Sequence, residues 1–203
     1  MTKQNLPAEI KFVVGVDEVG RGPLAGPIVF CAFKMSINFS AKTFGKLKDS
    51  KKLLPKKREE IFAKLEKLKK GKVVNYSIYS VSAKSIDKNG LSKAGKSCIE
   101  EVLKDLKIKP IESMILLDGG LKAPKKYKNQ KTIIKGDEKE RAIAFASIIA
   151  KVFRDGLMRK LSKKYPEYGF EIHKGYGTKK HRLLIKKYGL CPEHRKSFCR
   201  NIN

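Results

Sequence analysis

Short apolar runs alternate with longer amphipathic stretches along this chain, a pattern that predicts an α/β fold. The run at 12–16, Phe-Val-Val-Gly-Val, predicts a buried central strand, and the glycines and proline of 20–23 predict a turn after it. The run at 28–33 predicts a second strand, antiparallel to the first. Residues 34–50 are expected to form a loop.

The middle of the chain predicts a helix, a strand and two more helices. A helix is expected from Pro55 to Gly71, because proline suits the first helical turn and apolar side chains recur at helical spacing. Residues 73–81 are β-branched and aromatic and alternate with polar neighbours, which predicts a half-buried or edge strand. A short helix over 82–87 and a longer one over 90–107 are expected to follow.

Two further apolar runs, 114–117 and 132–134, precede a helix that is expected over 138–162. The segment Ala142–Ala150 of this helix is apolar on nearly all sides and should be buried, and its small residues would let it lie close to the sheet. The tail, 163–203, is rich in Lys, His, Tyr and Gly and predicts short helices and loops. This order of elements predicts a mixed sheet with helices packed against it.

Four carboxylates, Asp17, Glu18, Asp118 and Asp137, stand close behind three of the apolar runs. In open α/β sheets, binding sites form beyond the carboxyl ends of the strands, so these acids are expected to meet. Clustered acids repel one another unless a cation binds them, and carboxylate oxygens suit a hard divalent cation. Two such ions about 4 Å apart would activate a water and stabilise the leaving oxygen of a displacement at phosphorus.

Each acid taken alone has a simpler interpretation. A single Asp after a strand is most often a turn residue or a helix cap, and Asp137 could be the N-cap of the helix that follows it. Asp17 and Glu18 are neighbours, and neighbouring strand residues point to opposite faces. Both reach one site only if the strand ends or bulges there, which Gly15 and Gly20 would permit.

Length and composition fit one domain with a small appendage. At 203 residues, roughly 70% of the unfolded surface can be buried, so no disulfide is needed. No apolar stretch reaches the ~18 residues of a membrane span, and the N-terminus lacks the apolar core of a signal peptide. We therefore expect a cytoplasmic protein without membrane contact. A monomer is expected as well.

The net charge is extreme. Lys and Arg number 47 against 20 Asp and Glu, which gives +27 and favours a polyanionic partner, with nucleic acid as the first candidate. However, 39 of the 47 basic residues are lysines, and a lysine-rich proteome would give the same bias on solvated helix faces. Charge alone therefore leaves both interpretations open.

The four cysteines form no Cys-x-x-Cys pair. Cys31 and Cys98 lie in apolar contexts and are expected in the core. Cys191, His194 and Cys199 have an irregular spacing that matches structural zinc sites poorly. Reduced thiols are therefore expected.

The segment Gly15–Pro27, Gly-Val-Asp-Glu-Val-Gly-Arg-Gly-Pro-Leu-Ala-Gly-Pro, opens an ordered set of motifs. The others cover nearly the whole chain, at 49–53, 117–119, 135–137, 146–155, 165–170, 173–178 and 194–198. A lone Asp-Glu pair would be weak, but this ordered set is specific. The chain closely resembles ribonuclease HII, the type 2 ribonuclease H of bacteria.

The resemblance implies a ribonuclease H-like fold, with a five-stranded mixed sheet flanked by helices. It implies a catalytic domain over 1–162 and a C-terminal helical extension over 163–203 that contributes to substrate binding. The implied activity is hydrolysis of the RNA strand of RNA–DNA hybrids, together with incision on the 5′ side of single ribonucleotides embedded in duplex DNA. The products would carry 3′-hydroxyl and 5′-phosphate ends, as ribonucleotide excision repair requires.

The family's four acidic positions match Asp17, Glu18, Asp118 and Asp137, which would be the catalytic residues and would hold two Mg²⁺ or Mn²⁺ ions. The family's glycine-arginine-glycine turn, which reads the ribose 2′-hydroxyl through backbone contacts, matches Gly20, Arg21 and Gly22. The family tyrosine that packs on the following sugar matches Tyr176. Phosphate contacts are expected from Lys51 and Lys174.

Two positions depart from the family pattern. Gly120 stands where many members have Asn, and Glu138 stands where a small residue is usual. Neither removes an expected metal ligand. Outside the resemblance, the alternatives are another nuclease or strand-transferase of this fold, a non-catalytic basic nucleic-acid-binding protein, and a magnesium enzyme acting on small phosphates. The last lacks a Gly-x-x-x-x-Gly-Lys loop.

Overall fold

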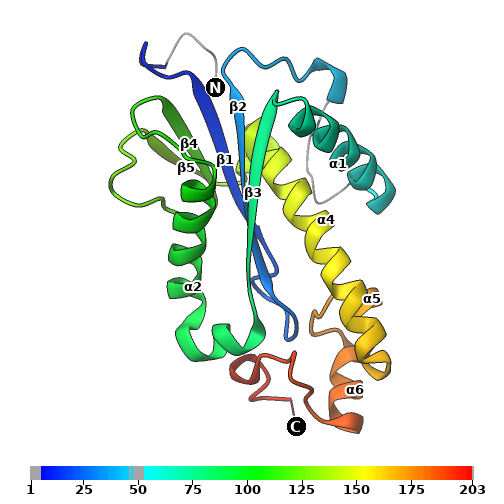
Figure 1. Cartoon of the computed structure of the whole chain (residues 1–203). Helices are drawn as coiled ribbons and strands as arrows, with labels where there is room; N and C mark the ends of the chain where they lie inside the picture. Colours follow the sequence, from blue (N-terminus) through cyan, green and yellow to red (C-terminus); the bar gives the residue numbers. More distant parts are fainter. Residues whose placement is uncertain (1–5, 46, 48–52, 203) are drawn as a thin grey trace.

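The computed structural model describes residues 6–45, 47 and 53–202, so Lys51 lies outside the described residues. A five-stranded sheet in the order β3-β2-β1-β4-β5 forms the centre of the molecule (Figure 1). Its strands are β1 Phe12–Val19, β2 Ile28–Ser36, β3 Val74–Val81, β4 Ser113–Asp118 and β5 Gln130–Ile133.

The sheet is mixed, as predicted. Strand β2 pairs antiparallel with both β1 and β3, whereas β4 pairs parallel with both β1 and β5. The predicted edge position of β3 is confirmed by the strand order. Strand β2 continues to Ser36, and a 3₁₀ turn, η2, covers Lys42–Phe44, so the loop expected over 34–50 begins later and is partly structured.

Helices cover both faces of the sheet (Figure 1). Helix α2, Ala83–Asp105, packs on one face, while α1, Pro55–Lys70, and α4, Arg141–Lys164, pack on the other. Helix α1 begins at the predicted proline and ends at the predicted glycine. Gly90 has φ 75° and ψ 156°, so it divides α2 into the short and the long helical segments that the sequence predicts.

Helix α4 lies unusually close to β1. Every residue from Ala142 to Ala150 is buried, which confirms the predicted burial on all sides. A Cβ atom added at Gly15 would lie 2.1 Å from the carbonyl carbon of Ala142. The helix backbone therefore rests directly on a glycine of the central strand, and this contact fixes where the segment containing Ser147 crosses the sheet.

The start of the helix predicted over 138–162 is wrong. A one-turn helix, α3, covers Gly136–Lys139, and Glu140 is extended, with φ −124° and ψ 120°, before α4 begins. Strand β5 has already ended at Ile133, and Ile134 is 74% exposed. The chain therefore turns away from the sheet before it reaches Asp137.

The tail forms short helices and turns, as predicted: η3 Pro166–Tyr168, α5 Phe170–His173, α6 Lys179–Tyr188 and η4 Lys196–Phe198. They form a separate apolar cluster that includes Met158 of α4 and Leu24 and Ala25 from the connection between β1 and β2. The tail is thus packed against the segment that follows the first two acids. Across the described residues, no helix is long and apolar enough to cross a membrane.

Three buried histidines of the tail lie together, two of them hydrogen-bonded to each other and the third stacked on one of the two. His194 Nδ1 accepts from the Cys191 N–H, and His194 Nε2 lies 3.1 Å from His181 Nε2. His181 Nδ1 lies 2.9 Å from the Tyr176 carbonyl oxygen, to which it must donate. His173 stacks on His181, with ring centroids 4.1 Å apart. This pattern satisfies each ring nitrogen of His181 and His194 when both rings are neutral, and no place is left for an added proton.

Because of this burial, we expect acid to unfold the tail. Burial lowers the pKa of His181 and of His194 to about 4 from the ordinary 6.5, and it lowers the pKa of His173 as well. Between pH 6.5 and pH 4, these histidines bind protons in the unfolded chain but stay neutral in the folded chain. The free energy of unfolding therefore falls as pH falls. The loss is up to about 1.4 kcal/mol per pH unit for each of His181 and His194.

Thermal melting between pH 7.5 and 4.5 measures this loss, and the variant His194→Gln should show a shallower dependence because one titrating group is gone. Because the raised pKa of Asp17 acts in the opposite direction over this range, the comparison of the two proteins decides. A His194→Gln protein with the same pH dependence as the wild type would contradict the interpretation.

Candidate active site

Asp17 and Asp118 lie side by side where the parallel pairing of β1 with β4 ends. The last paired residues of β1 and β4 are Val16 and Leu117, so the next residue of each strand is one of these acids. Parallel neighbours end at the same edge of a sheet. The predicted strand-end position therefore holds for Asp118, whereas β1 extends past the predicted end to Val19 and Asp17 lies within it. The two acids, which come from positions 101 residues apart, are nevertheless brought together.

Asp17 is nearly enclosed, on the face of the sheet that α4 covers. It is 4% exposed, one carboxylate oxygen accepts the Glu18 N–H at 2.7 Å, and the side chain bonds to Ser147 of α4. Burial raises the pKa of Asp17 well above its ordinary value, and the negative charges of Asp118 and Glu18 raise it further. The ionised form of Asp17 is therefore disfavoured, and a bound cation would stabilise it.

Glu18 follows Asp17 within β1, and neighbouring residues of a strand point to opposite faces of the sheet. Strand β1 pairs with β2 in unbroken register through Val19, so the strand neither ends nor bulges on that side. Its pairing with β4 does end before Asp17, which leaves the strand edge free there. The Glu18 carboxylate lies 3.5 Å from the guanidinium of Arg21, and its charge reaches Asp17.

Asp118 and Asp137 are connected through Gly136. The Gly136 N–H donates to Asp118 Oδ1 at 2.6 Å, and the next residue, Asp137, is 1% exposed. Asp137 lies inside α3 and not at a strand tip, and Lys135 occupies the N-cap position with φ 54°. The N-cap interpretation of Asp137 is therefore wrong. Asp137 lines a cavity of about 170 Å³ to which no other expected acidic ligand contributes.

The donor set fits a hard divalent cation, because Asp17, Glu18 and Asp118 offer carboxylate oxygens whose charges already act on one another. In the observed side-chain positions, no three Asp, Glu, His or Cys residues of the described chain are arranged to hold a metal ion. Uncompensated carboxylates repel one another, so binding would require their side chains to move together. The four-acid metal site remains a prediction.

Gly20, Arg21 and Gly22 begin the β1–β2 loop, which comprises residues 20–27. Gly20 has φ 91°, and a Cβ atom there would lie 2.2 Å from Arg154 Nε, so only glycine fits. A Cβ atom at Gly22 would meet nothing within 4 Å. One side of the loop is thus tightly packed and the other is open.

Sequence reasoning missed two residues that hold this loop, Arg154 and Arg195. Both are fully buried, and both donate to backbone carbonyls of the loop. They lie within the matched segments 146–155 and 194–198, but the sequence around an arginine gives no sign of which distant carbonyls it will bind.

Of the other residues expected to contact substrate, Tyr176 and Lys174 lie near this loop, and Lys51 is not among the described residues. Tyr176 is 45% exposed, and its ring centroid lies 5.9 Å from the guanidinium carbon of Arg154. Lys174 has φ 52°, and its ammonium donates to the Glu171 carbonyl at 2.7 Å. Both lie in the tail, one residue on either side of Gly175, whose carbonyl accepts the Leu24 N–H at 2.8 Å.

A groove of about 560 Å³ lies beside Arg21, between α2 and the segment that follows β4. Its lining combines apolar side chains such as Leu91 and Ile99 with one carboxylate, Glu100, and four cations: Arg21, Lys96, Lys122 and Lys125. The Gln130 side chain holds one wall, because its amide bonds both the N–H and the carbonyl of Ala123, at 2.9 and 3.3 Å. This wall is therefore preformed, and its charge suits phosphodiesters.

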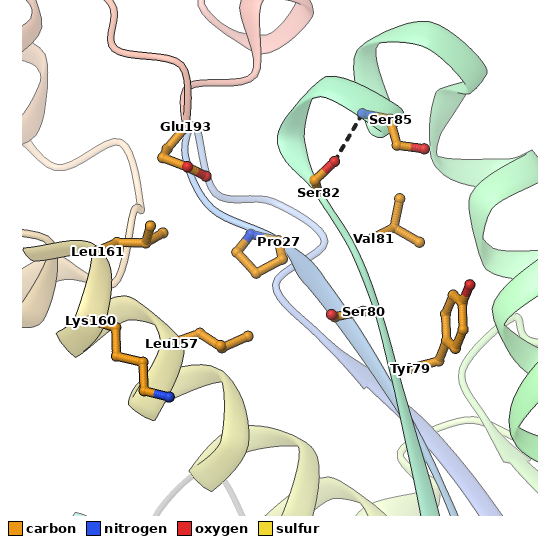
Figure 2. A pocket seen from close by; sticks show the side chains of 10 residues that line it. All are labelled: Pro27, Tyr79, Ser80, Val81, Ser82, Ser85, Leu157, Lys160, Leu161 and Glu193. Carbon is orange, nitrogen blue, oxygen red and sulfur yellow. Dashed lines mark hydrogen bonds between the residues drawn. The ribbon is translucent and has the colours of Figure 1, made fainter. Parts of the chain in front are cut away.

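A separate pocket of about 490 Å³ lies between β3 and α4 (Figure 2). Figure 2 shows Pro27 of the β1–β2 loop at its centre, with Leu157 and Leu161 of α4 facing it. None of the four acids lines this pocket. It is therefore distinct from the acid cluster.

The sheet order and the paired acids place the chain among enzymes of the ribonuclease H-like fold. Solved structures agree: ribonuclease H2 from Pyrococcus horikoshii OT3 superimposes with a TM-score of 0.72 at 30% identity, covering 94% of this chain and 96% of that one. The RNase HII structure from a PCNA complex of Archaeoglobus fulgidus gives a TM-score of 0.73 at 25% identity, covering 91% and 93%.

The chain belongs to the ribonuclease HII family, whose model matches residues 14–201. Ribonuclease HII of Caldicellulosiruptor bescii is 45% identical over 192 residues, which cover 95% of this chain and 88% of that protein. That of Caldicellulosiruptor saccharolyticus is 43% identical over 201 residues, covering 98% and 93%. The predicted resemblance, the fold and the enzyme class, a type 2 ribonuclease H that acts as an endoribonuclease on nucleic acid, are thereby confirmed, and the non-catalytic alternative is set aside.

Proposed function

We propose that this enzyme hydrolyses the RNA strand of RNA–DNA hybrids and incises duplex DNA on the 5′ side of single embedded ribonucleotides, leaving 3′-hydroxyl and 5′-phosphate ends. One observation supports this most strongly: the strand that carries Asp17 and Glu18 runs directly into the open Gly20–Gly22 turn. The groups suited to phosphodiester cleavage and those suited to reading a sugar therefore lie on one continuous segment.

Asp17, Glu18, Asp118 and Asp137 would hold two Mg²⁺ or Mn²⁺ ions. When bound, such a pair supplies activation of water and stabilisation of the charge on the leaving oxygen. The protein's own part is to hold the carboxylates: β1 and β4 place Asp17 and Asp118 side by side, and Ser147 orients Asp17. Among structural neighbours, Bst-RNase HIII was solved in complex with Mn²⁺, at 19% identity.

The histidines need no role as general base. His173, His181 and His194 are buried, and their ring nitrogens bond to backbone groups or to one another. They serve instead to fold the tail that carries Tyr176.

Sugar recognition would come from two adjacent elements. The Gly20-Arg21-Gly22 turn would contact the ribose 2′-hydroxyl, the group that distinguishes RNA from DNA at a given site. The exposed ring of Tyr176 would pack on the next sugar, where a flat ring suits a deoxyribose that lacks the hydroxyl. Lys174 and Lys51 would contact phosphates.

The proposal extends to the organisation of the enzyme. Residues 1–162 would form the catalytic domain, and residues 163–203 would add substrate contacts through Tyr176. The cationic groove beside Arg21 supports binding of a duplex that extends past the acids, and the net charge of +27 would make that binding sensitive to salt. We take the enzyme to act as a cytoplasmic monomer in ribonucleotide excision repair.

The proposal predicts a defined product. A labelled DNA duplex with one ribonucleotide should be cut once, 5′ to that ribonucleotide, in Mg²⁺ or Mn²⁺ and not in excess chelator. Gel analysis against size markers with known ends checks the position and the termini. Equal cleavage of an all-DNA duplex would refute sugar recognition, and tight binding without any cleavage would refute the catalytic assignment.

A further inference from the structure

Two fully buried arginines lie beneath the β1–β2 loop. Arg195 is 0% exposed and Arg154 is 1% exposed. Neither forms an ion pair with a carboxylate among residues 6–45, 47 and 53–202. Burial lowers the pKa of Arg195 to about 10, which still leaves it cationic at neutral pH. Burying a charge without a counter-charge is costly, so the hydrogen bonds of both guanidiniums must compensate.

Arg195 binds the carbonyls at both ends of the loop. Its Nη2 donates to the Gly20 carbonyl at 2.6 Å, and its Nη1 donates to the Arg21 carbonyl at 2.9 Å. Nε and Nη2 both donate to the Gly26 carbonyl, at 3.0 and 2.8 Å. The Arg195 N–H also donates to the Leu24 carbonyl at 2.7 Å. A planar fork with donors at fixed angles can hold these carbonyls at once, which a lysine cannot do.

Arg154 completes the support from α4. Its Nε donates to the Pro27 carbonyl at 2.9 Å and its Nη2 to the Ala25 carbonyl at 3.4 Å. The same guanidinium packs against the position where Gly20 would carry a side chain and lies 5.9 Å from the ring of Tyr176. One buried cation therefore contacts both elements to which sugar recognition is assigned.

The opposite side of the loop is free. Within the described chain, the N–H groups of Arg21 and Gly22 donate no hydrogen bond. A Cβ atom at Gly22 would meet nothing within 4 Å. Arg195 holds this turn through the Gly20 and Arg21 carbonyls, so the turn is fixed while its two amides remain available as donors to a ligand oxygen.

We propose that Arg154 and Arg195 are positioning residues that set ribose discrimination. By holding the loop through its carbonyls, they fix its free amides and Tyr176 in the arrangement that receives a ribose followed by a deoxyribose. The tail thus determines specificity through Arg195 as well as through Tyr176. This inference rests on the proposed function of the loop. Preorganisation of this kind matters because small displacements of a bound substrate reduce rates strongly.

The test pairs a conservative variant with a change in the substrate. Arg195→Lys keeps the charge but loses the fork. On the single-ribonucleotide duplex, we expect kcat to fall by about 10- to 100-fold with KM changed by less than about threefold. Replacing the 2′-hydroxyl by 2′-fluorine should then reduce cleavage much less in Arg195→Lys than in the wild-type enzyme, because the variant no longer presents the amides correctly.

A merely structural role would give a different pattern. If the folded Arg195→Lys enzyme loses the same factor on 2′-fluoro substitution as the wild type, the two changes are independent and the proposal is overturned. Arg154→Lys provides a second measurement on the other support, and if both variants are unfolded at 25 °C the residues are structural only, which also overturns it. Arg159→Lys is the matched control, because this α4 arginine is half exposed and pairs with Glu59.

The wild-type enzyme alone shows whether the proposed sugar recognition is right. If the wild-type enzyme itself cleaves the 2′-fluoro and 2′-hydroxyl duplexes equally, the loop does not read the sugar, and the proposed function fails before any variant is considered.

Discussion

Replacing Asp17 with asparagine is expected to abolish cleavage while making the folded protein more stable. The carboxylate lies beside Asp118 where the pairing of β1 with β4 ends. Loss of this expected metal ligand should remove several kcal/mol of transition-state stabilisation, about 10³-fold or more in rate. The same carboxylate is buried beside two negative charges, which raise its pKa well above the ordinary value. Asparagine keeps the shape and removes the unfavourable charge.

The sign of the stability change follows from the protonation states. At neutral pH, the ionised Asp17 carboxylate is stable in the unfolded chain, but its charge costs free energy in the folded chain. Removing the charge therefore raises the melting temperature. The gain should vanish as pH falls below the ordinary Asp value of 3.8, where both states hold the proton. Below that value the variant and the wild type should differ little.

Melting curves in chelator and in Mg²⁺, together with single-turnover cleavage of the single-ribonucleotide duplex, measure both effects. The wild-type enzyme should gain stability from Mg²⁺ and the variant should gain much less, since binding stabilises only the state that binds. Asp105→Asn, at an exposed position at the end of α2, is the control and should change neither property. An active or a destabilised Asp17→Asn protein would contradict the assignment.

Replacing Gly15 with alanine is expected to cause the largest loss of stability. The added methyl would lie 2.1 Å from the carbonyl carbon of Ala142 and 2.3 Å from the Ile143 nitrogen, which are backbone atoms that cannot rotate away. Helix α4 would have to move off β1, so the free energy of unfolding should fall by about 3 kcal/mol or more. This is a large share of the total for a single domain.

Urea unfolding of Gly15→Ala measures this loss. Gly156→Ala is the matched control on α4 itself, because its nearest neighbour is a flexible arginine end 3.9 Å away. There the same substitution should stabilise the helix by about 0.5–1 kcal/mol. A Gly15→Ala protein with wild-type stability would show that the helix does not rest on the strand as described. Activity should fall with stability, since Ser147 of α4 orients Asp17.

Local patterns predicted the elements where local physics decides them. A few neighbouring residues were enough to predict three kinds of feature: the strands β1, β2 and β4 from their apolar runs, the ends of α1 from a proline and a glycine, and the buried part of α4 from its apolar segment. The same patterns misplaced the segment before α4. Nothing local shows that the chain leaves the sheet at Ile133 and forms a separate turn of helix around Asp137 before Glu140 breaks it.

For the candidate site, the sequence alone predicted the four acids as metal ligands and the Gly20–Gly22 turn as the sugar contact, because an ordered set of motifs spans the chain and these residue types suit cation and ribose chemistry. Only the tertiary structure decided how they are held. Parallel pairing of β1 with β4 brings Asp17 to Asp118, and the buried guanidiniums of Arg154 and Arg195 bind the carbonyls of the β1–β2 loop. Such contacts join residues more than 100 positions apart, and the geometry that selects them exists only after the chain has packed.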